Sequence, residues 1–343
     1  MMILAVVILL LCVILYCLIS TVYTKGFGKH TGGNAHYLTY LYDHYSDRYH
    51  RREVVISGKA AELHAFIYGE ENSKALVVFA HGIGAFHEEY MSAIIWLVDH
   101  GYRVLAPDLS GSGHSSGHTT GLPQSAIDLH SVLCYIEKDP ELSKLPVMLF
   151  GHSWGSYGVG AVLNYDHAVK AVVHIAGYND PIEMITDVFR MTLGKIAGIA
   201  VPFLRLHHRI HFGKAGFFSV VNGLNRANIP ALVVQGAEDP LNTPDGNSIY
   251  AHRNQVKNKK VEYMYITKEG CANHGSPFHT DAANRLETKI LQDIAELTKQ
   301  FSGEELEQKL ELYYADIDRN LLSQPNPELM EYVDAFYSKA LSS

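Results

Sequence analysis

The stretch that decides the fold is PVMLFGHSWGSYGVG, residues 146–160. Its first five residues are apolar and indicate a buried strand, while its last residues are mostly small and indicate a helix. Between them, Gly151-His152-Ser153-Trp154-Gly155 has the pattern G-x-S-x-G. Small residues on both sides of a serine permit a tight strand-to-helix turn that keeps the hydroxyl oxygen exposed. We therefore expect Ser153 to be the nucleophile if the protein is an enzyme, and a buried turn serine if it is not.

The same pattern occurs a second time, at Gly113-His114-Ser115-Ser116-Gly117. The chain has 28 glycines, so a chance match is not surprising and the flanking residues must decide. Turn-forming residues surround this second match, with LSGS at 109–112 before it and TTG at 119–121 after it. We expect Ser115 to lie in a loop and not to be a nucleophile.

Short apolar runs bounded by turn residues recur along the chain. They lie at 75–80, 102–106, 147–150, 171–176, 231–235 and 261–266. Helical patterns fall between several of them, at 88–100, 123–137, 154–164 and 280–301. Residues 52–57 and 61–68 indicate a leading antiparallel hairpin. This alternation predicts the α/β class, with a mainly parallel central sheet whose strands are buried on both faces by flanking helices.

A serine hydroxyl is a weak nucleophile at neutral pH, so it needs a general base and an acid that orients that base. The chain order serine, acid, histidine is the one expected on this kind of sheet. Asp239 follows the run at 231–235 and would project from the carboxyl end of that strand. Glu238 is the second choice for the acid, and Asp245 is less favoured.

The expected base is His274, which stands in the loop directly after the last apolar run, 261–266. His279, five residues further on and near the start of a helical pattern, is a weaker candidate. The chain has 20 histidines, so position in the sequence, and not residue type, carries this choice.

Acyl transfer also needs backbone N–H donors for the developing oxyanion, since one lost donor costs about 3 kcal/mol of transition-state stabilisation. One expected donor is the amide of Trp154, directly after the serine. The other is the amide of Ile83, in the HGIG sequence at 81–84 that follows the run at 75–80. A simple turn is the alternative reading of HGIG.

Residues 1–19 form an unbroken apolar run. As a helix this run spans about 28 Å, close to the ~30 Å hydrocarbon thickness of a bilayer. No Lys or Arg precedes it and Ser20-Thr21-Val22 is a poor cleavage site, so we expect an uncleaved single-pass anchor and not a signal peptide. Lys25 and Lys29 follow the run, which favours the cytoplasmic side for the rest of the chain.

Two segments interrupt the alternation of strands and helices. Residues 178–228 separate two strands by far more than one helix requires. Within them, residues 188–216 hold five basic and no acidic side chains among many apolar ones. That composition fits either a surface against anionic lipid headgroups or an ordinary helical lid. Residues 302–343 are acidic and helix-rich, and a break at 324–327 indicates a helical pair.

Composition excludes several classes of function. Asp and Glu outnumber Lys and Arg by 36 to 28, so the net charge is −8 and no nucleic-acid partner is expected. The four cysteines form no CxxC pair, which argues against a disulfide framework or a zinc knuckle. His207 and His211 lie one helical turn apart, but no acidic residue is nearby to complete a metal site. We therefore expect no metal. We also expect no cofactor, because phosphate-binding and dinucleotide-binding motifs are missing.

Five motifs occur in the order FAHGIG, GYRVLAPDLSGSGHSSG, GHSWGSYG, QGAEDP and NHGSP. Over residues 52–301 the chain resembles the α/β-hydrolase superfamily, and it is most similar to the monoacylglycerol lipase, lysophospholipase and serine aminopeptidase-like group. The resemblance implies the α/β-hydrolase fold. It implies these site residues: Ser153 as nucleophile, Asp239 as acid, His274 as base, and the amides of Ile83 and Trp154 as oxyanion donors.

The same resemblance implies that residues 178–228 form a lid over an acyl pocket. Ser156 departs from the family pattern, since many members have glycine there. We expect six segments: a transmembrane anchor at 1–23, a linker at 24–51, a first part of the hydrolase core at 52–177, the lid at 178–228, a second part of the core at 229–301 and a C-terminal helical extension at 302–343.

Together these features predict a membrane-anchored serine hydrolase that cleaves carboxylic esters through an acyl-enzyme. The anchor and the apolar, basic segment favour lipid-like monoesters such as monoacylglycerol or lysophospholipid, with the bilayer as a partner. An amidase or aminopeptidase is the alternative among enzymes. A non-catalytic binding protein on the same fold is the alternative outside them.

Overall fold

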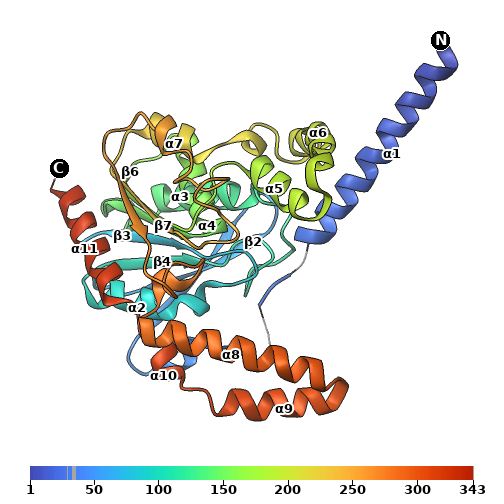
Figure 1. Cartoon of the computed structure of the whole chain (residues 1–343). Coiled ribbons are helices and arrows are strands. Elements are labelled where there is room, and N and C mark those ends of the chain that lie inside the picture. The colour runs from blue at the N-terminus through green and yellow to red at the C-terminus, as the bar shows by residue number, and fades with distance from the viewer. Residues whose placement is uncertain (29, 33–35, 343) are drawn as a thin grey trace.

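The computed structural model describes residues 1–28, 30–32 and 36–342 (Figure 1). Lys29, one of the two basic residues expected after the N-terminal helix, lies outside them. Within the described residues, eight strands form one sheet in the order β1-β2-β4-β3-β5-β6-β7-β8. The strands are β1 (Arg51–Ser57), β2 (Glu62–Tyr68), β3 (Leu76–Ala80), β4 (Arg103–Pro107), β5 (Val147–His152), β6 (Val169–Ile175), β7 (Ala231–Gly236) and β8 (Val261–Ile266).

The sheet is mainly parallel, as predicted. Only β2 runs opposite to the other strands: it pairs antiparallel with β1 and with β4, and every later neighbouring pair is parallel. The order of the strands places β5 between β3 and β6, near the middle of the sheet. A residue at the carboxyl end of β5 therefore has neighbouring strand ends on both sides.

The helices, coloured by their position in the chain in Figure 1, follow the strands in alternation. They are α1 (Met2–Phe27), α2 (Met91–Asp99), α3 (Gln124–Lys138), α4 (Trp154–Ala161), α5 (Pro181–Leu193), α6 (Val201–Phe212), α7 (Val220–Ala227), α8 (Asp281–Gln300), α9 (Gly303–Ala315), α10 (Arg319–Leu322) and α11 (Pro327–Leu341).

Helices cover both faces of the sheet because side chains alternate between the faces along each strand. Val78 and Leu149 point to the face that packs on α3, α4 and α7. Their chain neighbours Phe79 and Phe150 point to the opposite face, where α2 and α11 pack. Burying such a side chain stabilises the fold by about 1.5–3 kcal/mol, so these two cores fix the sheet that positions the strand ends.

The last strand differs from its prediction. The run at 261–266 was expected to be buried on both faces, but in β8 every residue is half-buried or exposed. Tyr263 and Tyr265, for example, keep 36% and 42% of their surface exposed. This prediction is wrong because β8 is the edge of the sheet and has a neighbouring strand on one side only.

The segment expected as a C-terminal helical pair contains three helices. α9 and α10 pack with α8 around Ile290 and Leu322 and form an arm at one end of the molecule (Figure 1). α11 instead packs on the sheet, where Val333 and Tyr337 are fully buried. The Tyr337 hydroxyl donates to the carbonyl oxygen of Leu149 in β5 at 2.7 Å. Residues 302–343 are therefore partly in the core, because α11 covers one face of the sheet.

α1 is long and apolar enough to cross a membrane, although a signal sequence meets the same criterion. Its N-terminal half projects away from the rest of the molecule (Figure 1). Its C-terminal half packs on α6, with Ile19 and Tyr23 buried in the main core.

Candidate active site

Ser153 lies at the turn between β5 and α4. Its φ angle is +53°, a region that residues other than glycine rarely adopt, at a cost on the order of 1–3 kcal/mol. The Ser153 N–H donates to the carbonyl oxygen of Ile175 at 2.9 Å, which fixes the turn against the end of β6. A Cβ atom on Gly155 would lie 2.1 Å from the carbonyl oxygen of Ala80, so α4 begins in contact with β3 only because residue 155 is glycine.

The imidazole of His274 lies between Ser153 and Asp239. Its Nε2 atom is 2.9 Å from the Ser153 hydroxyl oxygen, and its Nδ1 atom is 2.8 Å from Oδ2 of Asp239. A carboxylate only accepts hydrogen bonds, so Nδ1 carries the proton when the ring is neutral. Nε2 is then free to accept the hydroxyl proton of Ser153. The structure therefore brings together the three side chains that the sequence singled out.

The carboxylate of Asp239 is held by the loop that follows β7. Its side chain has no exposed surface, and Oδ1 accepts the backbone N–H groups of Leu241 and Asn242 at 2.9 and 3.0 Å. These two bonds leave Oδ2 facing His274. A buried carboxylate with fixed donors keeps the imidazole in one tautomer and one orientation.

The other residues weighed for these roles lie elsewhere. Glu238 and Asp245 are exposed, and neither has a described contact with His274. The imidazole of His279 follows η8 (Ser276–Phe278), and its Nδ1 atom is buried without a hydrogen-bond partner in the described structure. Burial lowers the pKa of His279, which favours its neutral form.

The loop after β3 contains the second expected oxyanion donor, Ile83. His81 in this loop is fully buried: its Nδ1 donates to the carbonyl oxygen of Gly82 at 2.8 Å, and its Nε2 accepts the N–H of Leu109 at 3.0 Å. Burial lowers the pKa of His81, so the ring is a neutral structural link between two loops. A Cβ atom on Gly82 would lie 3.6 Å from the Cβ of Ser153, which places this loop against the serine.

Trp154, the other expected donor, is the first residue of α4. The first N–H groups of a helix have no partner within the helix and carry the positive end of its dipole. The amide of Trp154 is therefore available to an oxygen of a ligand at Ser153. Its indole is fixed separately, because Nε1 donates to the carbonyl oxygen of Leu122 at 2.8 Å.

A hydrogen-bonded chain links the loops of this site, and sequence reasoning missed it. The Gly82 N–H donates to the Tyr90 hydroxyl at 3.1 Å, which lies 2.8 Å from Nδ1 of His152. His152 Nε2 lies 3.2 Å from the carbonyl oxygen of His274 and donates to it, so Nδ1 accepts the Tyr90 hydroxyl proton. Burial, with the neighbouring His274, lowers the pKa of His152 to about 3, so this ring stays neutral. The only sequence signal was that His152 precedes the serine.

A second link runs from the N-terminal helix to the same turn. The Tyr23 hydroxyl accepts the N–H of Leu122 at 3.1 Å, and the carbonyl oxygen of Leu122 accepts the Trp154 indole. The Tyr23 hydroxyl is also 3.1 Å from Nε2 of His208 on α6. α1 is therefore connected, through one residue, to the helix that begins after Ser153.

In the described part of the chain, the candidate metal-ligand groups include neither Ser153, Asp239 nor His274. His207, which the sequence placed one turn from His211, has its Nδ1 2.9 Å from the Ser20 hydroxyl of α1. Two other groups have ligand atoms close together. They are His130, Cys134 and His167, and His87, Asp108 and His114.

Comparison with known proteins identifies the fold. Residues 71–216 match the family model described as serine aminopeptidase, S33, and no curated protein sequence matches the chain. Among solved structures, an esterase from Pyrococcus furiosus is 18% identical with a TM-score of 0.52, covering 80% of this chain and 98% of its own. An alpha-beta hydrolase from Vibrio vulnificus is 20% identical with a TM-score of 0.54, covering 81% of this chain and 91% of its own.

A third structure, Est1E from Butyrivibrio proteoclasticus with ferulic acid bound, is 18% identical with a TM-score of 0.50. Its alignment covers 70% of this chain and 98% of its own. At these identities the structures establish a shared fold and leave the reaction to be argued from the site.

Proposed function

We propose that this protein, whose chain has the α/β-hydrolase fold, is a membrane-anchored serine hydrolase that cleaves carboxylic esters. One observation carries the proposal: Asp239, His274 and the Ser153 hydroxyl are joined by hydrogen bonds of 2.8 and 2.9 Å beyond the carboxyl ends of the strands. A structural serine does not need a histidine held by a buried carboxylate. A nucleophilic serine does, because its hydroxyl must lose a proton as it attacks.

The reaction proceeds in two steps. Ser153 Oγ attacks the ester carbonyl while His274 Nε2 takes its proton, and the imidazolium is stabilised by Asp239. The amides of Ile83 and Trp154 stabilise the oxyanion of the tetrahedral intermediate. His274 then gives the proton to the departing alcohol, which leaves an acyl group on Ser153. Water activated by His274 attacks that acyl group and releases the acid.

The geometry of α1 supports attachment to a bilayer. Residues 1–14 are exposed throughout, whereas Leu15, Ile19 and Tyr23 pack on the domain. The thirteen helical residues among them, 2–14, extend about 20 Å, which is shorter than the ~30 Å hydrocarbon layer. If α1 crosses the bilayer, the helices packed beside its C-terminal half must therefore lie at or within the membrane surface.

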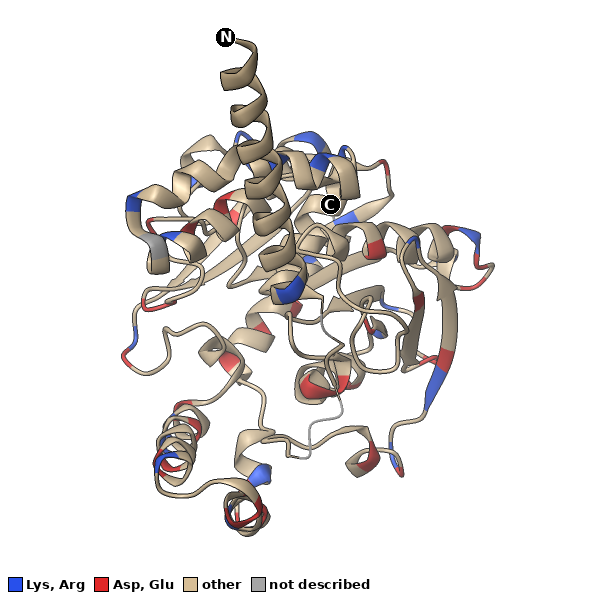
Figure 2. Cartoon of the chain, turned by 90° about the vertical axis from the view of Figure 1, so that its right-hand side faces the viewer, with Lys and Arg blue, Asp and Glu red and all other residues tan. Residues whose placement is uncertain are grey.

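Those neighbouring helices have the surface that such a position requires. α5, η5 (Gly194–Ala200) and α6 leave several large apolar side chains exposed: Val188, Met191, Ile196, Ile199, Leu206 and Ile210. Lys and Arg lie among them, and Figure 2 shows basic residues on both sides of α1. Apolar side chains can enter the acyl region while basic ones contact anionic headgroups. We propose that this part of the 178–228 insertion is a lid that lies in the membrane surface.

A lipid-like monoester is the substrate class this arrangement favours. An apolar cavity of about 570 Å³ lies between α1, α5 and η5, and its walls include Leu18, Val188 and Ile196. A cavity with apolar walls beside the anchor suits an acyl chain better than a polar substrate. Monoacylglycerol or lysophospholipid in the same membrane would reach the lid without crossing water.

An amide or peptide substrate is the second candidate. It is favoured by the family model over residues 71–216, whose description is serine aminopeptidase. The same serine, histidine and carboxylate attack amides and esters, so the site geometry alone does not separate these two substrate classes. A non-catalytic binding role is less favoured because each member of the hydrogen-bonded set is present.

The substrate panel that tests this proposal uses the full chain in detergent micelles or vesicles. It compares a long-chain monoacylglycerol, a short-chain p-nitrophenyl ester and an aminoacyl amide, with the Ser153→Ala variant as the blank. We expect the highest kcat/KM on the monoacylglycerol. Preference for the amide would replace the ester assignment, and equal rates in the variant and the wild type would refute the mechanism.

Membrane attachment has its own test. The full chain should remain with the membrane pellet after extraction with high salt and with alkaline carbonate, because an apolar helix is not held by charge. Recovery of the intact chain in the supernatant, with its first 24 residues still present, would contradict the anchor.

A further inference from the structure

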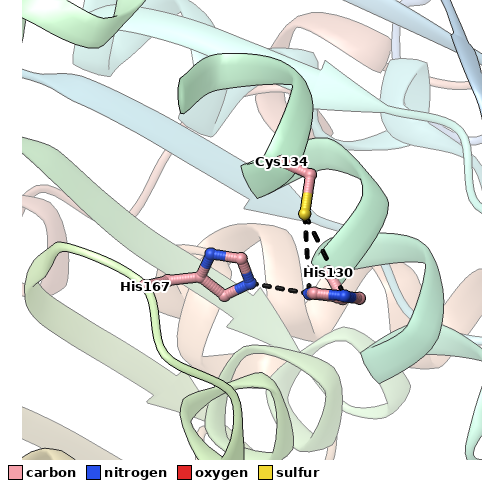
Figure 3. A group of neighbouring side chains, drawn as sticks. All are labelled: His130, Cys134 and His167. Atoms are coloured by element: carbon pink, nitrogen blue, oxygen red, sulfur yellow. Dashed lines mark hydrogen bonds between the residues drawn. The ribbon is translucent and has the colours of Figure 1, made fainter. Parts of the chain in front are cut away.

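Figure 3 shows a cluster of two histidines and one cysteine, none of them a residue of the Ser153 site. His130 and Cys134 are one turn apart on α3, so both project from the same face of that helix. His167 comes from the loop between η4 (Val162–Asn164) and β6. The ligand atoms of the three side chains all lie within 4.8 Å of one another.

The distances within the cluster are close to those of a metal site. His130 Nδ1 lies 2.7 Å from His167 Nε2, and Cys134 Sγ lies 3.8 Å from His130 Nδ1. In a tetrahedral Zn²⁺ site with Zn–N of ~2.0 Å and Zn–S of ~2.3 Å, the N–N and N–S separations are about 3.3 and 3.6 Å. The two imidazoles need to separate by roughly half an ångström to admit the ion.

Glu137 orients His167 for this role. Oε1 of Glu137 accepts a hydrogen bond from His167 Nδ1 at 2.7 Å, so Nδ1 carries a proton and Nε2 of the neutral ring is left with a lone pair. That lone pair is directed toward His130. A metal-binding histidine commonly donates its other ring N–H to a carboxylate, which fixes the tautomer and raises the basicity of the ligand atom.

His130 is fixed by stacking. Its ring lies parallel to that of Tyr165, with 3.9 Å between the centroids and 6° between the planes. The side chain of His167 is 4% exposed, so its position also is set by packing. A metal ion would therefore find its nitrogen ligands within about half an ångström of their final positions and would order few additional groups on binding.

The second group of candidate ligands serves as a contrast. There, each oxygen of Asp108 already accepts two N–H groups: Oδ1 from the backbone and ring of His87, and Oδ2 from the backbone and ring of His114. Nε2 of His87 accepts from the Arg51 guanidinium at 3.3 Å and from the Tyr68 hydroxyl at 3.0 Å. In this cluster the facing atoms of His87, Asp108 and His114 are already joined by hydrogen bonds, and a guanidinium cation lies against His87, which disfavours a metal ion there.

We propose that His130, Cys134 and His167 form a Zn²⁺ site, with water as the fourth ligand. On binding, the S–H bond of Cys134 breaks, a Zn–S bond forms and the proton leaves to solvent. The Nδ1 proton of His130 moves to Nε2 through solvent, so that Nδ1 binds the ion. His167 binds through Nε2 and keeps its N–H bond to Glu137.

The ion would join α3 to the chain that enters β6. α3 packs against α4, the helix that begins after Ser153, but none of the three ligands contacts the serine or His274 in the described structure. The site is therefore structural and separate from the proposed hydrolase reaction. A ligand that binds only the folded state stabilises it, so Zn²⁺ should raise the unfolding temperature.

The test measures thermal unfolding of the metal-free full chain with and without excess Zn²⁺. We expect a rise of several degrees for the wild type and no rise for Cys134→Ser or His167→Gln. His114→Gln and Cys271→Ser are the matched controls, because they remove the same residue types from other places. Both controls should keep the rise. A rise of equal size in all five proteins would show adventitious binding by surface histidines and overturn the proposal, as would no rise in the wild type.

A spectroscopic measurement keeps the proposal testable if a variant folds poorly. Co²⁺ bound by a thiolate gives an S-to-metal charge-transfer band, and tetrahedral Co²⁺ gives strong visible bands. We expect both in the wild type and in Cys271→Ser, and loss of the charge-transfer band in Cys134→Ser. Weak octahedral bands without charge transfer in the wild type would contradict a cysteine ligand.

Discussion

The two G-x-S-x-G sequences of this chain share a pattern and differ in every contact of their serines. Ser153 lies at a strained turn with its hydroxyl 2.9 Å from His274. Ser115 is 1% exposed, in the loop between β4 and α3; its hydroxyl donates to the carbonyl oxygen of Asp108 at 2.6 Å and accepts the N–H of His64 at 2.8 Å. The Ser153 hydroxyl faces the imidazole of His274, and the Ser115 hydroxyl joins a loop to β2.

The last glycines of the two motifs, Gly155 and Gly117, also have different physical roles. At Gly155 a Cβ atom would overlap the carbonyl oxygen of Ala80, so the requirement is close approach of a helix to a strand. At Gly117 there is room for a Cβ, 3.4 Å from that of Ala61, but φ is +76°, so the requirement is a left-handed backbone. The G-x-S-x-G pattern therefore indicates only that small residues flank a serine. The strand, helix or loop on either side determines what that serine contacts.

The largest expected difference between the motifs is in activity. Ser153→Ala should lower kcat by about 10⁵–10⁶-fold, because the nucleophile and its base act as one unit. Ser115→Ala should keep the wild-type kcat per folded molecule. Steady-state rates, normalised to the folded fraction from circular dichroism, provide the comparison. Similar losses in the two variants would mean that the motifs are not functionally distinct.

The next largest effect tests the carboxylate that orients the base. Asp239→Asn should lower kcat by about 10⁴-fold, since the amide would favour the wrong tautomer of His274. Glu238→Gln is the matched control, because Glu238 is exposed at the neighbouring position, and it should retain activity. The rates are measured on one ester substrate. Activity lost with Glu238→Gln and kept with Asp239→Asn would reverse the assignment of the acid.

Alanine substitutions at the glycines compare the two backbone requirements. Gly155→Ala should destabilise the fold by about 3 kcal/mol or more, because the new methyl would lie 2.1 Å from a backbone oxygen. Gly117→Ala should cost about 1–2 kcal/mol, the price of a left-handed backbone without a clash. Chemical denaturation gives both free energies of unfolding. A larger loss for Gly117→Ala would contradict the close approach of α4 to β3.

Ser115→Ala should lower the free energy of unfolding by about 1–3 kcal/mol, because the buried N–H of His64 loses its acceptor. Ser116→Ala is a suitable control: its hydroxyl also accepts a backbone N–H, that of Glu62 at 3.0 Å, but at an exposed site where water can replace it. Urea denaturation of both variants measures the difference. No loss for Ser115→Ala would show that the second motif has no structural role.

The smallest effect near neutral pH concerns Asp108, which holds the second motif. Burial alone would raise its pKa, but His87 and His114 overcome that effect and hold the pKa of this carboxyl well below its usual range. A carboxyl with a lowered folded-state pKa stabilises the fold above its unfolded pKa of about 4 and loses that contribution as the pH falls. The stability difference between wild type and Asp108→Asn should thus shrink below about pH 4. It should also fall as the pH rises above about 6.5, because the hydrogen bond to Asp108 raises the pKa of His114 and this contribution is lost when His114 deprotonates. A difference that grows below about pH 4 would contradict this linkage.

Much of the fold follows from local sequence. Apolar runs between turn residues give the strands to within one or two residues, because strands buried by helices on both faces require continuous apolar sequence. The context of Ser153, a buried strand followed by small residues, places it at a strand-to-helix turn, and the flanks of Ser115 place it in a loop. Position after the last two strands was enough to choose Asp239 and His274, which the structure places beside Ser153.

Contacts between distant segments could not be predicted from the sequence. The chain from Gly82 through Tyr90 and His152 joins three segments that are distant in sequence, and nothing in their local patterns shows that they contact one another. The position of α11 was missed because an amphipathic helix shows that it has an apolar face and not which surface covers that face. The packing of Tyr23 against α6 was missed for a related reason, since α1 is apolar on all sides.

Labelling with a fluorophosphonate probe, followed by digestion and mass spectrometry of the modified peptide, tests the nucleophile most directly. An activated serine attacks phosphorus and keeps the adduct, whereas an ordinary serine does not react. We predict one adduct, on Ser153, in the wild type and in Ser115→Ala, and none in Ser153→Ala. An adduct on any other serine, or a folded wild-type protein that takes up no probe, would contradict the account.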